Sequence, residues 1–206
     1  ADGGILSITT DGGDDDNACL IAGRYRPANG GCEMEARFKH NTTGAAQLAI
    51  FAGFSETMAF GTPVMPAEFA TVTMTYNGTG GMMGAMIDPD ATTDDWRTVG
   101  GDGGAATGGN GQGTRASETI TADEWYIVRT EVNPDGNGSV FVGHKGEQLD
   151  LIRVTSAVHG FSFTGAAVTP GDQQYAVLMC ENRSAAAKIM EVDYMYAKGW
   201  RDWANN

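Results

Sequence analysis

Apolar and polar residues alternate with a period of two along most of this chain. From Cys32 to Lys39, apolar side chains alternate with charged ones without interruption. Successive side chains of a strand point to opposite faces of its sheet, so this pattern predicts a strand with one face on a core and the other in water. Phe69 to Asn77 repeats the pattern, with threonine at alternate positions.

Other segments extend the same reading. Gln47 to Ser55 is apolar on both faces, which indicates a central strand. Glu124–Asn133 and Gly138–Lys145 flank Pro134-Asp135-Gly136, a sequence typical of a hairpin turn. Further strands are predicted at Leu149–Val154, Gln174–Glu181 and Lys188–Tyr196. Residues 184–188 offer at most one helical turn, so we predict an all-β fold: a two-sheet antiparallel sandwich with very little helix.

We expect one domain over residues 1–206, with three segments outside its core. Residues 1–17 are predicted to form an N-terminal arm and an acidic loop, and residues 197–206 an aromatic tail. Residues 100–113 are more than half glycine and bury too little apolar area to offset their ordering entropy, which predicts a mobile loop. The 30 glycines of the chain show no period of three, which indicates turns rather than collagen.

Charge and cysteine content narrow the environment and the partners. The formal net charge of −13 argues against nucleic acid and against an anionic membrane as partners, because both are bound through basic surfaces. Cys19, Cys32 and Cys180 are too few and too scattered for a disulfide framework. We therefore predict three free thiols, at least two of them buried, and folding in a reducing compartment.

Several short segments follow one another in a recognisable order. They are Asp16–Cys19, Glu33–Phe38, Phe51–Ser55, Glu124–Arg129 leading to Pro134–Gly136, and Met190–Tyr194. This order resembles the concanavalin A-like lectin/glucanase superfamily. More closely, it is similar to the jelly-roll structural proteins of tailed bacteriophages that decorate or cement capsids. The resemblance spans about residues 16–196 and implies a jelly-roll sandwich.

The resemblance also implies a function. We expect a virion structural protein, a decoration or cement protein on the outer surface of a phage head. It would be made in the host cytoplasm, bind the major capsid protein and assemble as a homotrimer. An alternative is a carbohydrate-binding module on a phage fibre or tail that binds host polysaccharide. A third is a degenerate glycan hydrolase.

The chemistry of glucanases of this fold requires two carboxylates on one face of one strand. Glu33 and Glu35 have the spacing of such a pair, but the third carboxylate of the family pattern is missing. Glu191 and Asp193 fall on the last predicted strand, where the family places structural residues. We read all four as solvated strand faces and expect no enzymatic activity, no catalytic residue and no cofactor.

Two groups of residues are candidates for ligand binding. Asp14, Asp15 and Asp16 offer clustered carboxylates with glycine neighbours, which hard cations such as calcium favour. A solvated acidic turn is the favoured reading, because the alternation of a calcium-binding loop is missing. Trp96 is a candidate glycan platform, and packing is the competing reading.

The C-terminal segment has the composition of an interface. Tyr196, Trp200 and Trp203 are interleaved with Arg201, and aromatic residues and arginine are enriched at interface anchors. The competing reading folds both tryptophans back onto their own domain. Methionines such as Met82, Met83 and Met86 suit an adaptable contact surface or, more commonly, core filling.

Overall fold

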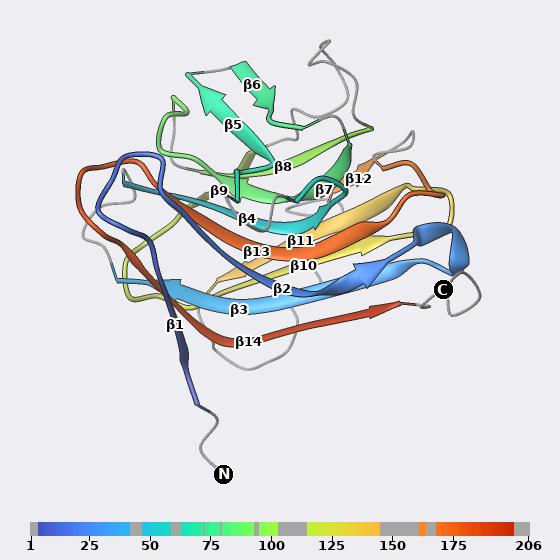
Figure 1. Cartoon of the computed structure of the whole chain (residues 1–206), viewed down its shortest axis with the longest axis horizontal. Helices are drawn as coiled ribbons and strands as arrows, with labels where there is room; N and C mark the ends of the chain where they lie inside the picture. The colour runs from blue at the N-terminus through green and yellow to red at the C-terminus, as the bar shows by residue number, and fades with distance from the viewer. Residues whose placement is uncertain are drawn as a thin grey trace.

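The computed structural model describes residues 4–41, 47–58, 63–71, 73–78, 80–92, 95–102, 115–144, 161–163 and 168–199. These residues form two six-stranded antiparallel sheets packed face to face, with a two-stranded hairpin on one side (Figure 1). The described part contains no α-helix; its helical structure is limited to 3₁₀ turns such as Pro27–Asn29. The predicted two-sheet sandwich with very little helix is confirmed.

Each sheet is built from strands far apart in sequence. Sheet A has the order β1 (Leu6–Thr9), β14 (Ile189–Gly199), β3 (Cys32–His40), β10 (Tyr126–Val132), β11 (Gly138–His144), β12 (Phe161–Phe163). Sheet B has the order β2 (Asn17–Tyr25), β13 (Gln174–Asn182), β4 (Leu48–Ser55), β7 (Gly81–Ile87), β8 (Asp95–Asp102), β9 (Arg115–Thr119). The hairpin joins β5 (Ala67–Ala70) to β6 (Thr73–Tyr76).

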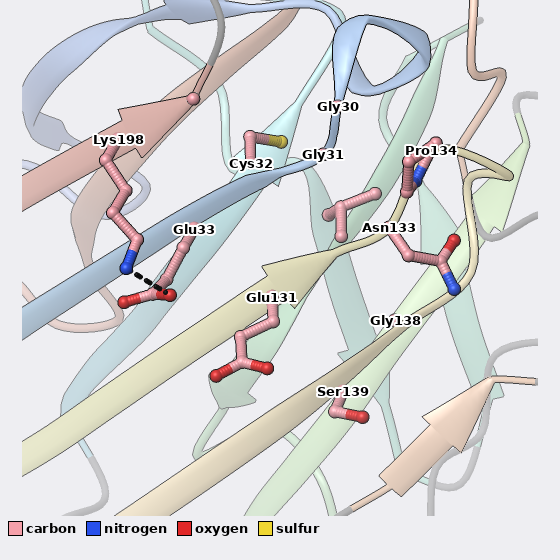
Figure 2. Close-up of a pocket in the computed structure, with 12 residues that line it drawn as sticks. Gly30, Gly31, Cys32, Glu33, Glu131, Asn133, Pro134, Gly138, Ser139 and Lys198 are labelled. Carbon is pink, nitrogen blue, oxygen red and sulfur yellow. Dashed lines mark ion pairs between the residues drawn. The ribbon is translucent and has the colours of Figure 1, made fainter.

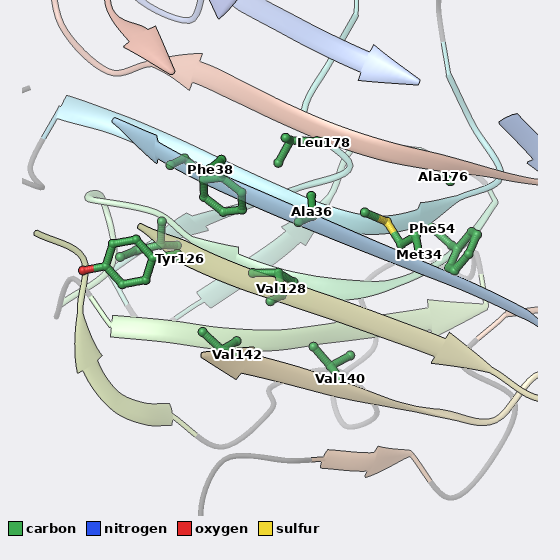
Figure 3. Packing of buried hydrophobic residues seen from close by; sticks show 14 of the residues in the cluster. Met34, Ala36, Phe38, Phe54, Tyr126, Val128, Val140, Val142, Ala176 and Leu178 are labelled. Atoms are coloured by element: carbon green, nitrogen blue, oxygen red, sulfur yellow. The ribbon is translucent and has the colours of Figure 1, made fainter. Parts of the chain in front are cut away.

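The main core lies between the two sheets and is filled by alternate residues of each strand. Met34, Ala36 and Phe38 of β3 face Leu178 of β13 across the sandwich (Figure 3). The neighbouring strand β10 contributes Tyr126, Val128 and Val132, and the buried Thr130 completes the spacing of two residues on this face. The period of two in the sequence therefore identified which side chains of these strands face the core.

Trp96 is part of this core, in line with the packing interpretation, so its ring is not available as a glycan platform. Its side chain is 0% exposed, with ring contacts to Phe38 at 6.0 Å and Tyr126 at 6.1 Å between centroids. The strand β8 lies inside sheet B, between β7 and β9, and Trp96 points toward sheet A. The next residue, Arg97, lies on the other face of the strand, with its guanidinium over the ring of Phe69 in the hairpin.

A second apolar cluster lies on the opposite face of sheet B, under the β5–β6 hairpin (Figure 1). Phe51 of β4 and Met82 and Met86 of β7 are buried there against Phe69 and Met74 of the hairpin. Met83, on the other face of β7, belongs to the main core. All three methionines considered as a contact surface are thus core residues.

Segment boundaries differ from the predictions in four places. The predicted strand from Phe69 to Asn77 is instead the β5–β6 hairpin, with Thr71 at a φ of 61° between the two strands. The expected N-terminal arm contains a strand, because residues 6–9 pair with β14. The expected glycine-rich loop starts later, since Gly100 and Gly101 belong to β8. There the ring of Tyr76 packs so closely that a Cβ on Gly101 would lie 2.7 Å from its hydroxyl oxygen. Residues 197–199 belong to β14 rather than to a tail.

The predicted turn at Pro134–Gly136 is confirmed. The flanking strands β10 and β11 pair in register from Tyr126 with His144 to Val132 with Gly138. Gly136 has a φ of 78°, in the region that favours glycine, which explains its place in the turn. The predicted strand at 149–154 and residues 103–113 of the predicted loop lie outside the described residues. In the described part, no helix has the length and apolar character needed to span a bilayer.

Candidate functional site

The outer face of sheet A carries rows of polar side chains set by the strand register. One row runs across four strands from Lys198 through Glu33 and Glu131 to Ser139, and the next from Tyr196 through Glu35 and Arg129 to Phe141. We call this surface the polar face. Its described members are Glu33, Glu35, Arg37, Lys39, Trp125, Arg129, Glu131, Ser139, Phe141, Glu191, Asp193, Tyr194, Tyr196 and Lys198.

Glu33 is the centre of the polar face. One carboxylate oxygen accepts a hydrogen bond of 2.5 Å from the hydroxyl of Tyr196, and the other lies 2.9 Å from Arg129 Nη2 and 3.0 Å from Lys198 Nζ. Burial acts to raise the pKa of Glu33, but the hydrogen bonds from Tyr196 and Lys198 and the charge of Arg129 lower it below its ordinary value. Glu33 therefore remains ionised and is poorly suited to donate a proton.

Glu35 lies one row further along the same strand. The hydroxyl of Tyr194 donates a 2.6 Å hydrogen bond to its Oε1, while its Oε2 is buried without a hydrogen-bond partner among the described residues. Glu33 and Glu35 are only 8% and 6% exposed, so the prediction that they form a solvated face is wrong. The reason is the pairing of β14 with β3, which brings two tyrosines to the two glutamates.

The basic side chains of the polar face are all paired with carboxylates. Arg129 Nη2 also lies 2.8 Å from Glu131 Oε1. Toward the other end of the face, Arg37 pairs with Asp193 at 2.5 Å and Lys39 with Glu191 at 2.9 Å. No basic group among the described residues of this face is left without a counter-charge.

Trp125 is a member of the polar face that the sequence analysis did not single out. Arg37 Cζ lies 4.6 Å and Lys39 Nζ 5.3 Å from the centroid of its ring, distances typical of cation–π contacts. Its side chain is half-buried, whereas the next residue, Tyr126, points into the core. The alternation of β10 is the sequence signal that separates the two aromatic residues.

A groove of about 760 Å³ opens at the end of the polar face where β3 begins and β10 and β14 end (Figure 2). We call it the sheet A groove. It is lined by Gly30, Gly31, Cys32, Glu33, Glu131, Val132, Asn133, Pro134, Gly138, Ser139, Lys198 and Gly199. Carboxylate, amide, hydroxyl and ammonium groups share this wall, and such a mixture of donors and acceptors suits a ligand rich in hydroxyl groups.

Two aspartates of the predicted acidic turn, Asp15 and Asp16, have partners within the chain. Asp15 Oδ1 lies 2.7 Å from Arg183 Nη1, and Asp16 Oδ2 accepts a 2.7 Å hydrogen bond from the backbone of Gly13. The same guanidinium contacts Glu181 at 2.7 Å and Asp88 at 3.2 Å. Arg183 thus supplies the positive charge at this cluster, and the described residues contain no group of His, Cys, Asp or Glu side chains arranged to hold a metal ion.

Of the four predicted interface residues, Tyr196 lies in the described part of the chain. Tyr196 lies on β14, 38% exposed, with its hydroxyl on Glu33, so it belongs to the polar face. Trp200, Arg201 and Trp203 lie outside the described residues.

The predicted free thiols are confirmed. Cys32 and Cys180 are buried and Cys19 is half-buried, and none forms a disulfide. Burial raises the pKa of both Cys32 and Cys180 to about 12. These two thiols are therefore protonated at neutral pH and act as packing groups.

No family model and no curated protein matches the sequence. Solved structures do match. The Emp47p carbohydrate recognition domain superposes with a TM-score of 0.59 at 10% identity, over 96% of this chain and 89% of that one. Peanut lectin gives 0.56 at 11% identity, over 93% and 84%. The family 7 alginate lyase A1-II', solved in complex with product, gives 0.51 at 12% identity, over 95% and 80%. At these identities the likeness shows the fold alone, a concanavalin A-like β-sandwich.

Proposed function

We propose that this protein is a non-catalytic structural protein of a phage virion, a decoration or cement protein on the outer surface of the head. It binds the major capsid protein as a homotrimer after synthesis in the host cytoplasm. The order of sequence segments described above supports this function. The structural observation that carries it is the edge of sheet A: among the described residues β1 pairs with β14 alone, and Ile5 and Leu6 are 53% and 49% exposed there. Open, apolar sheet edges are normally covered by a partner.

The state of the carboxylates supports a non-catalytic role. A general acid needs a pKa near the working pH and access to substrate. Glu33 lines the groove, but its pKa is lowered. Glu181 has a pKa raised to about 7 by burial, but it is enclosed against Arg183, away from the groove. Lectins and a lyase share this fold, so the fold itself does not decide the question.

The test is re-addition of purified protein to phage heads that lack it. We expect the wild-type chain to co-sediment with the heads, and the double variant Ile5→Asp, Leu6→Asp to lose about tenfold or more in occupancy, because two charges would have to be buried at the edge. Val64→Asp is the matched control, since Val64 is 47% exposed and precedes the β5–β6 hairpin on the sheet B side. Folded wild-type protein that does not bind heads would refute the proposal.

A second candidate function is favoured by the sheet A groove. A carbohydrate-binding module on a phage fibre or tail would hold a host polysaccharide in this groove, beside the exposed ring of Tyr196. The neighbouring lectin structures support this reading, and so does the mixed wall of donors and acceptors. Glycan-array binding tests it directly. We expect Lys198→Ala with Ser139→Ala to weaken any glycan binding about fivefold or more, and Val64→Asp to leave it unchanged.

A further inference from the structure

We infer that the sheet A groove selects uncharged oligosaccharides over polyuronates, and that Glu131 sets this preference. The inference deepens the carbohydrate-binding function proposed above and rests on it. It concerns which saccharide class the wall of the groove accepts, which the fold does not reveal.

The first observation is the balance of charge in the groove. Arg129 Nη2 lies 2.9 Å from Glu33 and 2.8 Å from Glu131, and Lys198 Nζ lies 3.0 Å from Glu33. Arg129, which pairs with the two lining glutamates without lining the groove itself, thus completes a balanced set of two basic and two acidic side chains. A ligand carboxylate would have to displace Glu131 from Arg129 or approach it as a like charge, and both cost free energy.

The second observation is the hydrogen-bonding character of the wall. Asn133 Oδ1 already accepts from the backbone of Asp135 at 3.1 Å and of Asn137 at 3.0 Å, so its amide Nδ2 is the group left to face a ligand. Glu131 is acceptor-only, partly exposed, and opposite Ser139 in the register (Figure 2). A sugar hydroxyl can donate to Glu131 and accept from Asn133, whereas an ionised uronate carboxylate can only accept.

The third observation is that Arg129 has little freedom to rearrange, unlike Lys198 at the rim of the groove. The side chain of Arg129 is 15% exposed and is held between two strands by both glutamates. Lys198 is 66% exposed and is the one groove-lining cation with access to solvent. Removing the charge of Glu131 would leave Arg129 with Glu33 alone and give the groove a net positive charge.

The experiment is calorimetric titration of the full chain with two sets of hexasaccharides, neutral ones of glucose, mannose or galactose and charged ones of galacturonate or guluronate. We expect the wild-type chain to bind at least one neutral hexasaccharide about tenfold or more tightly than any hexauronate. Glu131→Gln keeps the size of the side chain and should shift this ratio toward the hexauronates by about tenfold. Glu191→Gln, the same change at the far end of the polar face, is the control and should leave the ratio unchanged.

The outcomes separate the inference from the function beneath it. Wild-type protein that prefers hexauronates would overturn the inference and leave carbohydrate binding intact, and so would a folded Glu131→Gln chain whose ratio matches wild type. Binding of neither class would overturn the carbohydrate-binding function and the inference together. The wild-type ratio is informative even where the variant does not fold.

Discussion

The outer face of sheet A carries charged and tyrosine side chains and is not covered by the hairpin, whereas the outer face of sheet B carries an apolar cluster under the β5–β6 hairpin. Both faces follow from the same strand alternation. On sheet A the side chains are held by cross-strand pairs such as Tyr196 with Glu33. On sheet B, Phe51 and Met86 are held by burial. The two faces therefore differ in what stabilises their side chains: burial under the hairpin on sheet B, and hydrogen bonds and ion pairs on sheet A.

The covering of sheet B is anchored at several points. Asp88 Oδ2 accepts a 2.8 Å hydrogen bond from the backbone of Phe69, and the hydroxyl of Tyr76 donates to the carbonyl of Gly100. Arg97 lies with its Cζ 4.9 Å from the centroid of the Phe69 ring. Asp88 also pairs with Arg183, so the hairpin and the buried charge cluster form one unit.

The largest effect is expected from opening the covered face. Phe51→Ala removes a fully buried ring beneath the hairpin and should lower the free energy of unfolding by about 3–5 kcal/mol, because a cavity remains. Denaturant unfolding measures it. Tyr196→Phe on the polar face is the comparison and should cost about 1 kcal/mol. Equal losses of unfolding free energy in the two variants would mean that burial on sheet B stabilises the fold no more than pairing on sheet A does.

The next prediction concerns how stability depends on pH at the charge cluster in which Arg183 pairs with Glu181, Asp88 and Asp15. Burial raises the pKa of Glu181 to about 7, so its contribution is full below the pKa of the unfolded chain and is lost as the pH rises through 7. Glu181→Gln removes this loss. Relative to wild type, we expect the variant to gain about 1–2 kcal/mol on going from pH 5 to pH 8.5. A constant difference between the two unfolding curves across this range would contradict the assignment.

Glu33 on sheet A should show the opposite dependence. Its pKa is lowered in the folded chain, so its contribution is present above the pKa of the unfolded chain and is lost as the pH falls through the folded value. Glu33→Gln should therefore cost about 1–2 kcal/mol at pH 7, with the cost shrinking below pH 4. Thermal unfolding at a series of pH values measures this. A cost that instead grows toward low pH would show that Glu33 is not held as a carboxylate.

The smallest effect is expected at the rim of the groove. Lys198 is 66% exposed, and its pair with Glu33 meets water and salt, so Lys198→Ala should change the free energy of unfolding by less than about 0.5 kcal/mol. Denaturant unfolding at low and high salt checks this. A cost of several kcal/mol would mean that the polar face is as structural as the covered one.

Much of the fold was predictable from the sequence, because the patterns that specify a strand or a turn lie within short stretches of the chain. The strand at 32–40 follows from its alternation, and the hairpin at Pro134–Gly136 follows from a turn in which Gly136 takes a positive φ. The free, mostly buried cysteines followed from their number and apolar context. The candidate site was predictable only in part: Glu33, Glu35 and Tyr196 were singled out, but not as one network.

By itself, the sequence determined the all-β class, the faces shared by residues within each strand, and the free cysteines, because these depend on spacing along the chain. Only the tertiary structure decided that β14 lies beside β3 and brings two tyrosines to Glu33 and Glu35. It also decided that Trp96 points inward and that the hairpin covers sheet B rather than sheet A. A period of two places residues on a common face, but strand order depends on contacts between residues more than a hundred positions apart, which alternation does not record.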